Sequence, residues 1–225
     1  MDEEVYLENL FLDSGGIYGY TICGALQYLK EQNLLNNIKN ILGCSVGGIV
    51  ALLLCLGFTS EEITAIAFNL DTGKLVNVKK NNFFNIYYKF GFEPGHKLEN
   101  IIKSLIKNKT GNENYTFQDL HENYQKKLII IGSNINTRSH EIFNVENTPQ
   151  MELWKAIRIT CAIPLLFQPF EFKGNLYVDG GNSLHNTNYF IDKHKSLGII
   201  LENSATHARK ISSFEDYLKN LIFFP

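Results

Sequence analysis

The amino-acid sequence predicts an α/β fold with a largely parallel central sheet. Short apolar segments alternate along the chain with segments whose apolar residues recur at helical spacing. Several of the apolar segments run directly into glycine-containing corners, and neither a repeat nor a linker divides the chain. We therefore expect a single domain over residues 1–225, with a core over about 7–201 and a C-terminal extension at 202–225.

The first part of the chain predicts two strands, each followed by a helix. The first strand ends at Asp13-Ser14-Gly15-Gly16, and the second ends at the corner around Ser45. Thr59 is a predicted N-cap, because Glu61 and Glu62 follow it in the first turn of a third helix. The predicted strands are 5–12 and 38–43, and the predicted helices are 17–32, 49–54 and 60–70.

The second part begins with a segment rich in Asn, Lys and aromatic residues, at 71–95, which has no clear period. We interpret this segment as an irregular excursion or cap. Ser213 is a predicted N-cap of a short helix within the C-terminal extension. The other predicted elements are helices at 98–106 and 151–160, strands at 128–131, 141–145, 175–178 and 197–201, and a polar loop at 107–114.

Composition excludes several classes of protein. The net charge of −2 gives no general attraction to nucleic acid, so we expect no nucleic-acid partner. The longest apolar run, at 49–58, is about half of the ~20 residues that a membrane span needs. The acidic N-terminus is unlike a secretion signal. We expect a cytoplasmic protein with reduced cysteines and transient contact with membrane surfaces.

Three corners that follow strands offer complementary chemical groups. The backbone amides of Gly15 and Gly16 open into a helix N-terminus, which suits a developing oxyanion. The corner Gly43-Cys44-Ser45-Val46-Gly47 has the G-x-S-x-G pattern, which holds a serine hydroxyl away from the backbone. Asp179 lies beside two glycines, Gly180 and Gly181, that leave room around its carboxylate. Carboxyl ends of parallel strands share one edge, so we expect these groups to meet there.

The three motifs, in this order, resemble those of the patatin-like phospholipases. These enzymes have a glycine-rich oxyanion loop, then G-x-S-x-G, then D-G-G or D-G-A far downstream. The chain has Gly15-Gly16-Ile17-Tyr18-Gly19 in the first position, and the segment Arg158 to Pro164 is similar to the family segment before the aspartate. The resemblance covers about residues 7–201 and implies a three-layer α/β/α fold.

The resemblance assigns a role to each motif. It implies a lipid acyl hydrolase with Ser45 as nucleophile, Asp179 as base, and the amides of Gly15 and Gly16 as the oxyanion hole. Its substrates would be phospholipids, lysophospholipids or neutral lipids, and it implies no metal and no organic cofactor. Two positions depart from the family pattern: Ser14 replaces a glycine, and Tyr18 replaces a lysine or arginine.

Other interpretations remain open from the sequence. These departures would fit a catalytically inactive protein that keeps the fold for binding lipids or partners. An α/β-hydrolase with a Ser-His-Asp triad would use His194 or His207 after the aspartate. A dinucleotide-binding loop at Gly15-Gly16 is disfavoured, because Ser14 replaces the first glycine of that motif. The aromatic residues of the 71–95 segment would form part of the core or an acyl-chain wall.

Overall fold

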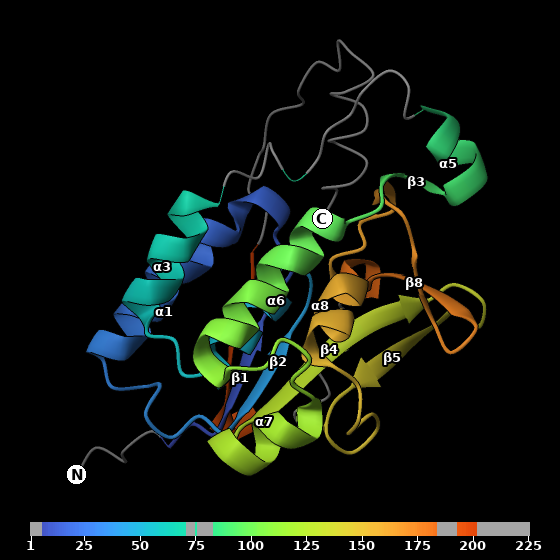
Figure 1. Cartoon of the computed structure of the whole chain (residues 1–225). Coiled ribbons are helices and arrows are strands. Elements are labelled where there is room, and N and C mark those ends of the chain that lie inside the picture. The colour runs from blue at the N-terminus through green and yellow to red at the C-terminus, as the bar shows by residue number, and fades with distance from the viewer. Residues whose placement is uncertain (1–5, 71–74, 76–82, 184–192, 202–225) are drawn as a thin grey trace.

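The computed structural model describes residues 6–70, 75, 83–183 and 193–201 (Figure 1). The predicted C-terminal helix capped by Ser213 lies outside the described residues. The helices are α1 (Tyr20–Glu31), α2 (Val46–Cys55), α3 (Ser60–Asn69), α5 (Phe83–Lys89), α6 (His96–Thr110), α7 (Phe117–Tyr124) and α8 (Leu153–Thr160). The strands are β1 (Asn9–Leu12), β2 (Asn40–Gly43), β3 (Gly91–Glu93), β4 (Lys127–Asn134), β5 (Ser139–Phe143), β6 (Leu165–Phe167), β7 (Phe170–Phe172), β8 (Asn175–Asp179) and β9 (Ser196–Ile199).

The central sheet has the strand order β7-β8-β4-β2-β1-β9, and β5 also pairs with β4. The strands β4, β2, β1 and β9 are parallel, with Leu12 opposite Gly43 on one side and Ile199 on the other. Strands β5, β8 and β7 add to this unit in antiparallel pairs. The predicted α/β fold with a largely parallel sheet is therefore confirmed.

The direction of β8 corrects one expectation. Asp179 does not lie at the carboxyl end of a parallel strand, because β8 runs antiparallel to β4, with Asp179 opposite Gly132. Gly43 pairs with Ile130, two residues earlier on β4. Strand β8 thus approaches from beyond the carboxyl edge of the parallel unit, and its last residue stops at that edge. The aspartate reaches the predicted place from the opposite direction.

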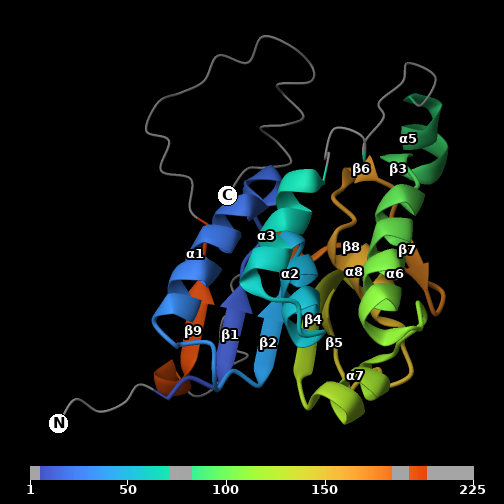
Figure 2. The ribbon, with the colours of Figure 1, turned by 60° about the vertical axis from the view of Figure 1, so that its left-hand side comes forward.

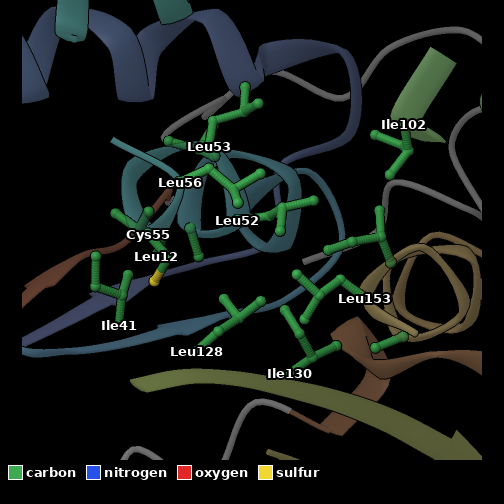
Figure 3. Packing of buried hydrophobic residues seen from close by; sticks show 14 of the residues in the cluster. Leu12, Ile41, Leu52, Leu53, Cys55, Leu56, Ile102, Leu128, Ile130 and Leu153 are labelled. Carbon is green, nitrogen blue, oxygen red and sulfur yellow. The ribbon is translucent and has the colours of Figure 1, made fainter. Parts of the chain in front are cut away.

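Both faces of the sheet are buried, as expected for a sheet inside a layered α/β fold. The large cluster surrounds α2 and includes Leu52 and Leu53 of this helix together with the strand residues Leu12 and Ile130 (Figure 3). Leu153 of α8 and Ile102 of α6 extend this cluster along the sheet (Figure 3). The second face has a smaller buried cluster formed by Phe11, Leu42, Ile129 and Ile131. The cysteines of the chain, Cys23, Cys44, Cys55 and Cys161, are free and buried.

Several elements differ from the predicted ones. The 71–95 segment contains α5 and β3, and β3 pairs in parallel with β6 to form a small second sheet. Helix α6 continues to Thr110, into residues predicted as a loop. Helix α7 was not predicted, although Thr116 and Asp119 form a capping box at its start. No helix among the described residues is long and apolar enough to cross a bilayer.

Candidate active site

Ser45 occupies the sharp corner between β2 and α2. Its backbone has φ 53° and ψ −126°, a conformation that L-residues rarely adopt. The Ser45 amide donates to Oγ1 of Thr160 over 2.9 Å, and its carbonyl accepts from Sγ of Cys161 over 3.4 Å. Thr160 ends α8 and Cys161 follows it, so the end of α8 holds the strained corner in place.

The glycines of this corner are required by close contacts between backbones. A Cβ atom on Gly47 would lie 2.3 Å from the carbonyl oxygen of Leu12, and one on Gly43 would lie 2.5 Å from the carbonyl oxygen of Gly47. Such distances are far inside van der Waals contact. The G-x-S-x-G pattern therefore lets β1, β2 and α2 approach each other closely enough to form the corner.

The side chains of Ser45 and Asp179 contact each other directly. Ser45 Oγ donates to Asp179 Oδ2 over 2.6 Å, although 134 positions separate the two residues in the chain. Both residues are buried, with 5% of Ser45 and 6% of Asp179 exposed. A hydroxyl and a carboxylate at this distance form the hydrogen bond along which a proton would pass.

The surroundings of Asp179 fix its position and change its acidity. Its Oδ1 accepts from the amide of Gly181 over 2.7 Å, and its own amide donates to the carbonyl of Ala162 over 3.0 Å. The hydroxyl of Ser133 donates to the carbonyl oxygen of Asp179 over 3.1 Å. Burial raises the pKa of Asp179 to about 6, while the hydrogen bonds from Ser45 and Gly181 lower it in part. The carboxyl group is therefore mainly ionised at pH 7.

The glycine-rich loop lies against both parts of this pair. A Cβ atom on Gly181 would lie 3.2 Å from Cβ and Oγ of Ser14, and one on Gly19 would lie 2.3 Å from Cγ2 of Val46, the residue after Ser45. Gly16 begins the short 3₁₀ helix η1 (Gly16–Gly19) with φ 49°. The first amides of a helical turn have no partner within it, so they are available to an incoming group.

Two more predicted glycines fit close packing near the aspartate. A Cβ atom on Gly180 would lie 2.6 Å from the carbonyl oxygen of Ile131 and 3.0 Å from Sγ of Cys44. The space beside Asp179 is thus closed on the side of β4. Gly181 faces Ser14 instead, so Ser14 takes part of the space that the paired glycines leave open.

Asp13 was not singled out from the sequence, although it follows a strand and precedes two glycines with only Ser14 between. Its side chain is buried, and Oδ1 accepts from the amide of Ser14 over 2.5 Å and from the Ser14 hydroxyl over 3.3 Å. The backbone of Leu201 also bonds to it. Burial raises the pKa of Asp13. Asp13 therefore ties the glycine-rich loop to the residues that follow β9.

The contact of Thr160 with the Ser45 amide was also not predicted. A single threonine at the end of a helix has no distinctive pattern in a sequence.

His194 lies far from this arrangement. It belongs to the short helix η5 (Lys193–Lys195), directly before β9, and its side chain is exposed. Ser196 at the start of β9 pairs with Asn9 at the start of β1, so His194 lies at the opposite edge of the sheet from Ser45. The position of His194 contradicts its use in a triad. His207 lies outside the described residues.

Comparisons with known proteins identify relatives of this chain. The chain is 35% identical over 228 residues to "Uncharacterized protein R571" of Acanthamoeba polyphaga mimivirus, a match that covers 97% of this chain and 75% of that protein. It is 29% identical to "Probable lipid hydrolase 463L" of Invertebrate iridescent virus 6, over 78% of this chain and 60% of that protein. The chain thus spans only part of the length of these relatives.

The fold is similar to that of VipD from Legionella pneumophila. The crystal structure of VipD superposes with a TM-score of 0.73 at 18% sequence identity, over 85% of this chain and 49% of VipD. At this identity the likeness concerns the fold alone. A sequence model named "Patatin-like phospholipase" matches residues 10–191, which include all three corners of the site. The chain belongs to the patatin-like phospholipase family.

Proposed function

We propose that the protein is a serine acyl hydrolase that cleaves acyl esters of lipids through an acyl-serine intermediate. The observation that carries the proposal is the buried 2.6 Å hydrogen bond from Ser45 Oγ to Asp179 Oδ2. Because the pKa of Asp179 is raised to about 6, this carboxylate is a stronger base than an ordinary aspartate and is still ionised at neutral pH.

In the proposed acylation step, Ser45 Oγ attacks the carbonyl carbon of the ester while Asp179 takes the hydroxyl proton. The carbonyl oxygen becomes an oxyanion, for which the amides of Gly15 and Gly16 are the proposed donors. When this intermediate collapses, the bond to the alcohol oxygen breaks. Asp179 returns its proton to that oxygen, and the acyl group stays on Ser45.

In the proposed deacylation step, a water molecule attacks the acyl carbon of the acyl-serine. Asp179 again accepts the proton, now from the water, and returns it to Ser45 Oγ as the fatty acid leaves. Two hydrogen bonds keep the carboxylate in place through both steps: the Gly181 amide donates to its other oxygen, and the Asp179 amide donates to the carbonyl of Ala162.

Lipid esters are the proposed substrates because the chain belongs to this family and because its relative 463L is named a probable lipid hydrolase. Phospholipids, lysophospholipids and neutral lipids are all included. Tyr18 is relevant to the choice among them, because its ring lies where the family usually has a lysine or arginine. Its side chain is 47% exposed, so it adds a neutral phenol beside the loop instead of a charge.

The second candidate is a family member that binds lipid without cleaving it. Ser14 favours this candidate, since its side chain fills space beside Gly181 that the usual glycine would leave empty. The direct contact between Ser45 and Asp179 favours the enzyme.

The test is release of fatty acid from mixed vesicles of phospholipid and lysophospholipid by the wild type, Ser45→Ala and Asp179→Asn. We expect both variants to lose at least about a hundredfold in rate, as is usual when a nucleophile or base is removed. Ser139→Ala is the matched control, because this serine is exposed on β5 and should keep the full rate. A folded wild type that releases no fatty acid and is not labelled by a fluorophosphonate would favour the lipid-binding candidate.

A further inference from the structure

Large hydrophobic side chains are exposed unevenly over the described part of the chain. The highest exposures are those of Tyr87 (79%), Phe68 (76%) and Tyr88 (71%). Tyr87 and Tyr88 lie on α5, and Phe90 follows that helix with 58% of its surface exposed. We call Tyr87, Tyr88 and Phe90 the aromatic rim. Single exposed apolar residues are ordinary, but three within four positions are not.

The aromatic rim lies at the end of the molecule that holds the candidate site. In Figure 2 the arrowheads of β1 and β9 point upward, and α5 and β3 lie at the upper end. Tyr20, 52% exposed at the start of α1, belongs to the same end, as do three further exposed hydrophobic residues. Tyr18 follows β1, Phe68 lies in the last turn of α3, and Ile200 directly follows β9. These side chains therefore surround the carboxyl edge of the sheet, where Ser45 and Asp179 meet.

The aromatic rim is also connected to the site through the backbone. Strand β3 follows Phe90 and pairs with β6. The two strands pack tightly, because a Cβ atom added to Gly91 would lie 2.3 Å from the carbonyl oxygen of Phe167. The segment before β6 contains Ala162, whose carbonyl accepts from the amide of Asp179. Helix α5 is therefore linked through β3 and β6 to the segment that binds the Asp179 amide.

Buried Arg158 strengthens this connection. Its Nη2 atom donates to the carbonyls of Pro94 and Gln168, each over 2.8 Å, and these residues follow β3 and β6. The guanidinium lies on α8, two residues before Thr160, which holds the Ser45 amide. Arg158 thus joins the small sheet below α5 to the helix that positions the serine.

The chemistry of the aromatic rim fits the surface of a lipid bilayer. Tyrosine has an apolar ring and a polar hydroxyl, and such side chains are enriched where hydrocarbon meets water. Exposed Lys89 lies between Tyr88 and Phe90 and would face the negative headgroups of anionic lipids. An ester in a bilayer reaches a buried serine over the shortest path when the edge of the sheet that carries the serine faces that bilayer. This argument rests on the proposed function.

We propose that the aromatic rim is a membrane-docking surface that inserts into the lipid interface and presents the Ser45 edge of the sheet to the bilayer. The experiment measures binding to vesicles in the Ser45→Ala background, so that no hydrolysis is needed. Co-sedimentation uses vesicles of phosphatidylcholine, with and without phosphatidylglycerol. The test variant combines Tyr87→Ser with Tyr88→Ser. A second test variant is Phe90→Asn, because φ is 61° at this position and Asn tolerates that conformation.

The matched control combines Tyr6→Ser with Tyr28→Ser. These tyrosines are 46% and 61% exposed, but Tyr6 precedes β1 at the opposite edge and Tyr28 lies near the far end of α1. We expect the Tyr87/Tyr88 variant to lose roughly tenfold in its partition onto vesicles, as follows when two partly inserted aromatic side chains are removed. The control should bind like the parent, and the melting temperatures of all variants should agree.

Three results would overturn the proposal. The first result is a parent protein that binds neither kind of vesicle. The second is a Tyr87/Tyr88 variant that binds vesicles as well as the parent does. The third result is a parent that is dimeric on size exclusion, is made monomeric by the Tyr87/Tyr88 change and binds no vesicles, which would make the aromatic rim an interface between copies. A failure of the proposed function is seen separately, as absence of fatty-acid release by a wild type that still binds vesicles.

Discussion

The corner around Ser45 and the glycine-rich loop beside it are both built on glycines, but different atoms surround those glycines. At Gly43 and Gly47 the atoms that a Cβ would meet belong to backbone, namely the carbonyls of Gly47 and Leu12. At Gly15 and Gly19 they belong to the side chains of Leu201 and Val46. A side chain can turn aside, whereas the backbone of a central strand cannot move without breaking the sheet.

This difference explains where the sequence can depart from the family pattern. The serine corner keeps every glycine of its motif, because any larger residue would collide with β1 or α2. The loop accepts Ser14 in place of a glycine, since Gly181 opposite it leaves room for a small side chain. Backbone atoms thus restrict the glycines of the serine corner, whereas side chains border Gly15 and Gly19 of the loop.

The largest effect is expected for Gly47→Ala. The new methyl group would lie 2.3 Å from the carbonyl oxygen of Leu12, so β1 and α2 must separate. We expect a loss of about 3 kcal/mol or more in the free energy of unfolding, measured by urea denaturation. Gly24→Ala on α1 is the control, because no atom lies within 4 Å of its Cβ position. Alanine favours helix there and should add about 0.5–1 kcal/mol. Equal effects of the two changes would contradict the account of the corner.

A somewhat smaller effect is expected for Asp179→Asn, and it depends on pH. Burial raises the pKa of Asp179 from 3.8 to about 6, so the folded protein binds this proton more tightly than the unfolded chain does. The wild type therefore loses stability as the pH rises from about 4 to about 6, where the buried carboxyl group ionises. Neutral asparagine removes this loss.

Between pH 4 and pH 7.5 the stability of Asp179→Asn should therefore rise by about 2 kcal/mol relative to the wild type. Paired urea denaturation curves across this range measure the difference, in which the other titrating groups cancel. A difference that stays constant with pH would mean that burial does not perturb this carboxyl group. The third corner, at Asp179, thus differs from the other two. Backbone hydrogen bonds fix its position, and the negative charge of its buried carboxylate destabilises the fold.

The smallest effect is expected for Gly15→Ala. Its new methyl group would meet Cδ1 of Leu201 at 2.2 Å, and this atom is the end of a flexible side chain. We expect a loss of about 1 kcal/mol. Leu201→Ala should remove the collision, so the double variant should be more stable than the sum of the single changes by about 1 kcal/mol. If the losses of the two single variants simply add in the double variant, the backbone, and not the Leu201 side chain, opposes a methyl group at position 15.

The sequence was sufficient to predict that Ser45 and Asp179 meet, because each of them lies within a short local motif. Ser45 and its glycines are adjacent in the chain, and so are Asp179 and Gly180. The structure brings Ser45 and Asp179 together as predicted. The oxyanion role of Gly15 and Gly16 stays a prediction, since it concerns a bound substrate.

The sequence was insufficient where structure depends on distant partners. The antiparallel direction of β8 follows from its pairing with β4, which no local pattern in residues 175–179 specifies. Strands β6 and β7 are short and lie beside Pro164 and Pro169, so neither shows an alternation long enough to recognise. Helix α7 could have been found, because Thr116 and Asp119 have the spacing of a capping box.

The separation of Ser45 from Asp179 by 134 positions also affects the protein during its synthesis. Elongation proceeds at about 5–20 residues per second, so the serine is made roughly 7 to 27 seconds before the aspartate. Until β8 pairs with β4, the nascent chain holds a serine whose hydroxyl has no carboxylate to accept its proton. The contact on which the proposed hydrolysis depends therefore exists only after β8 has paired with β4.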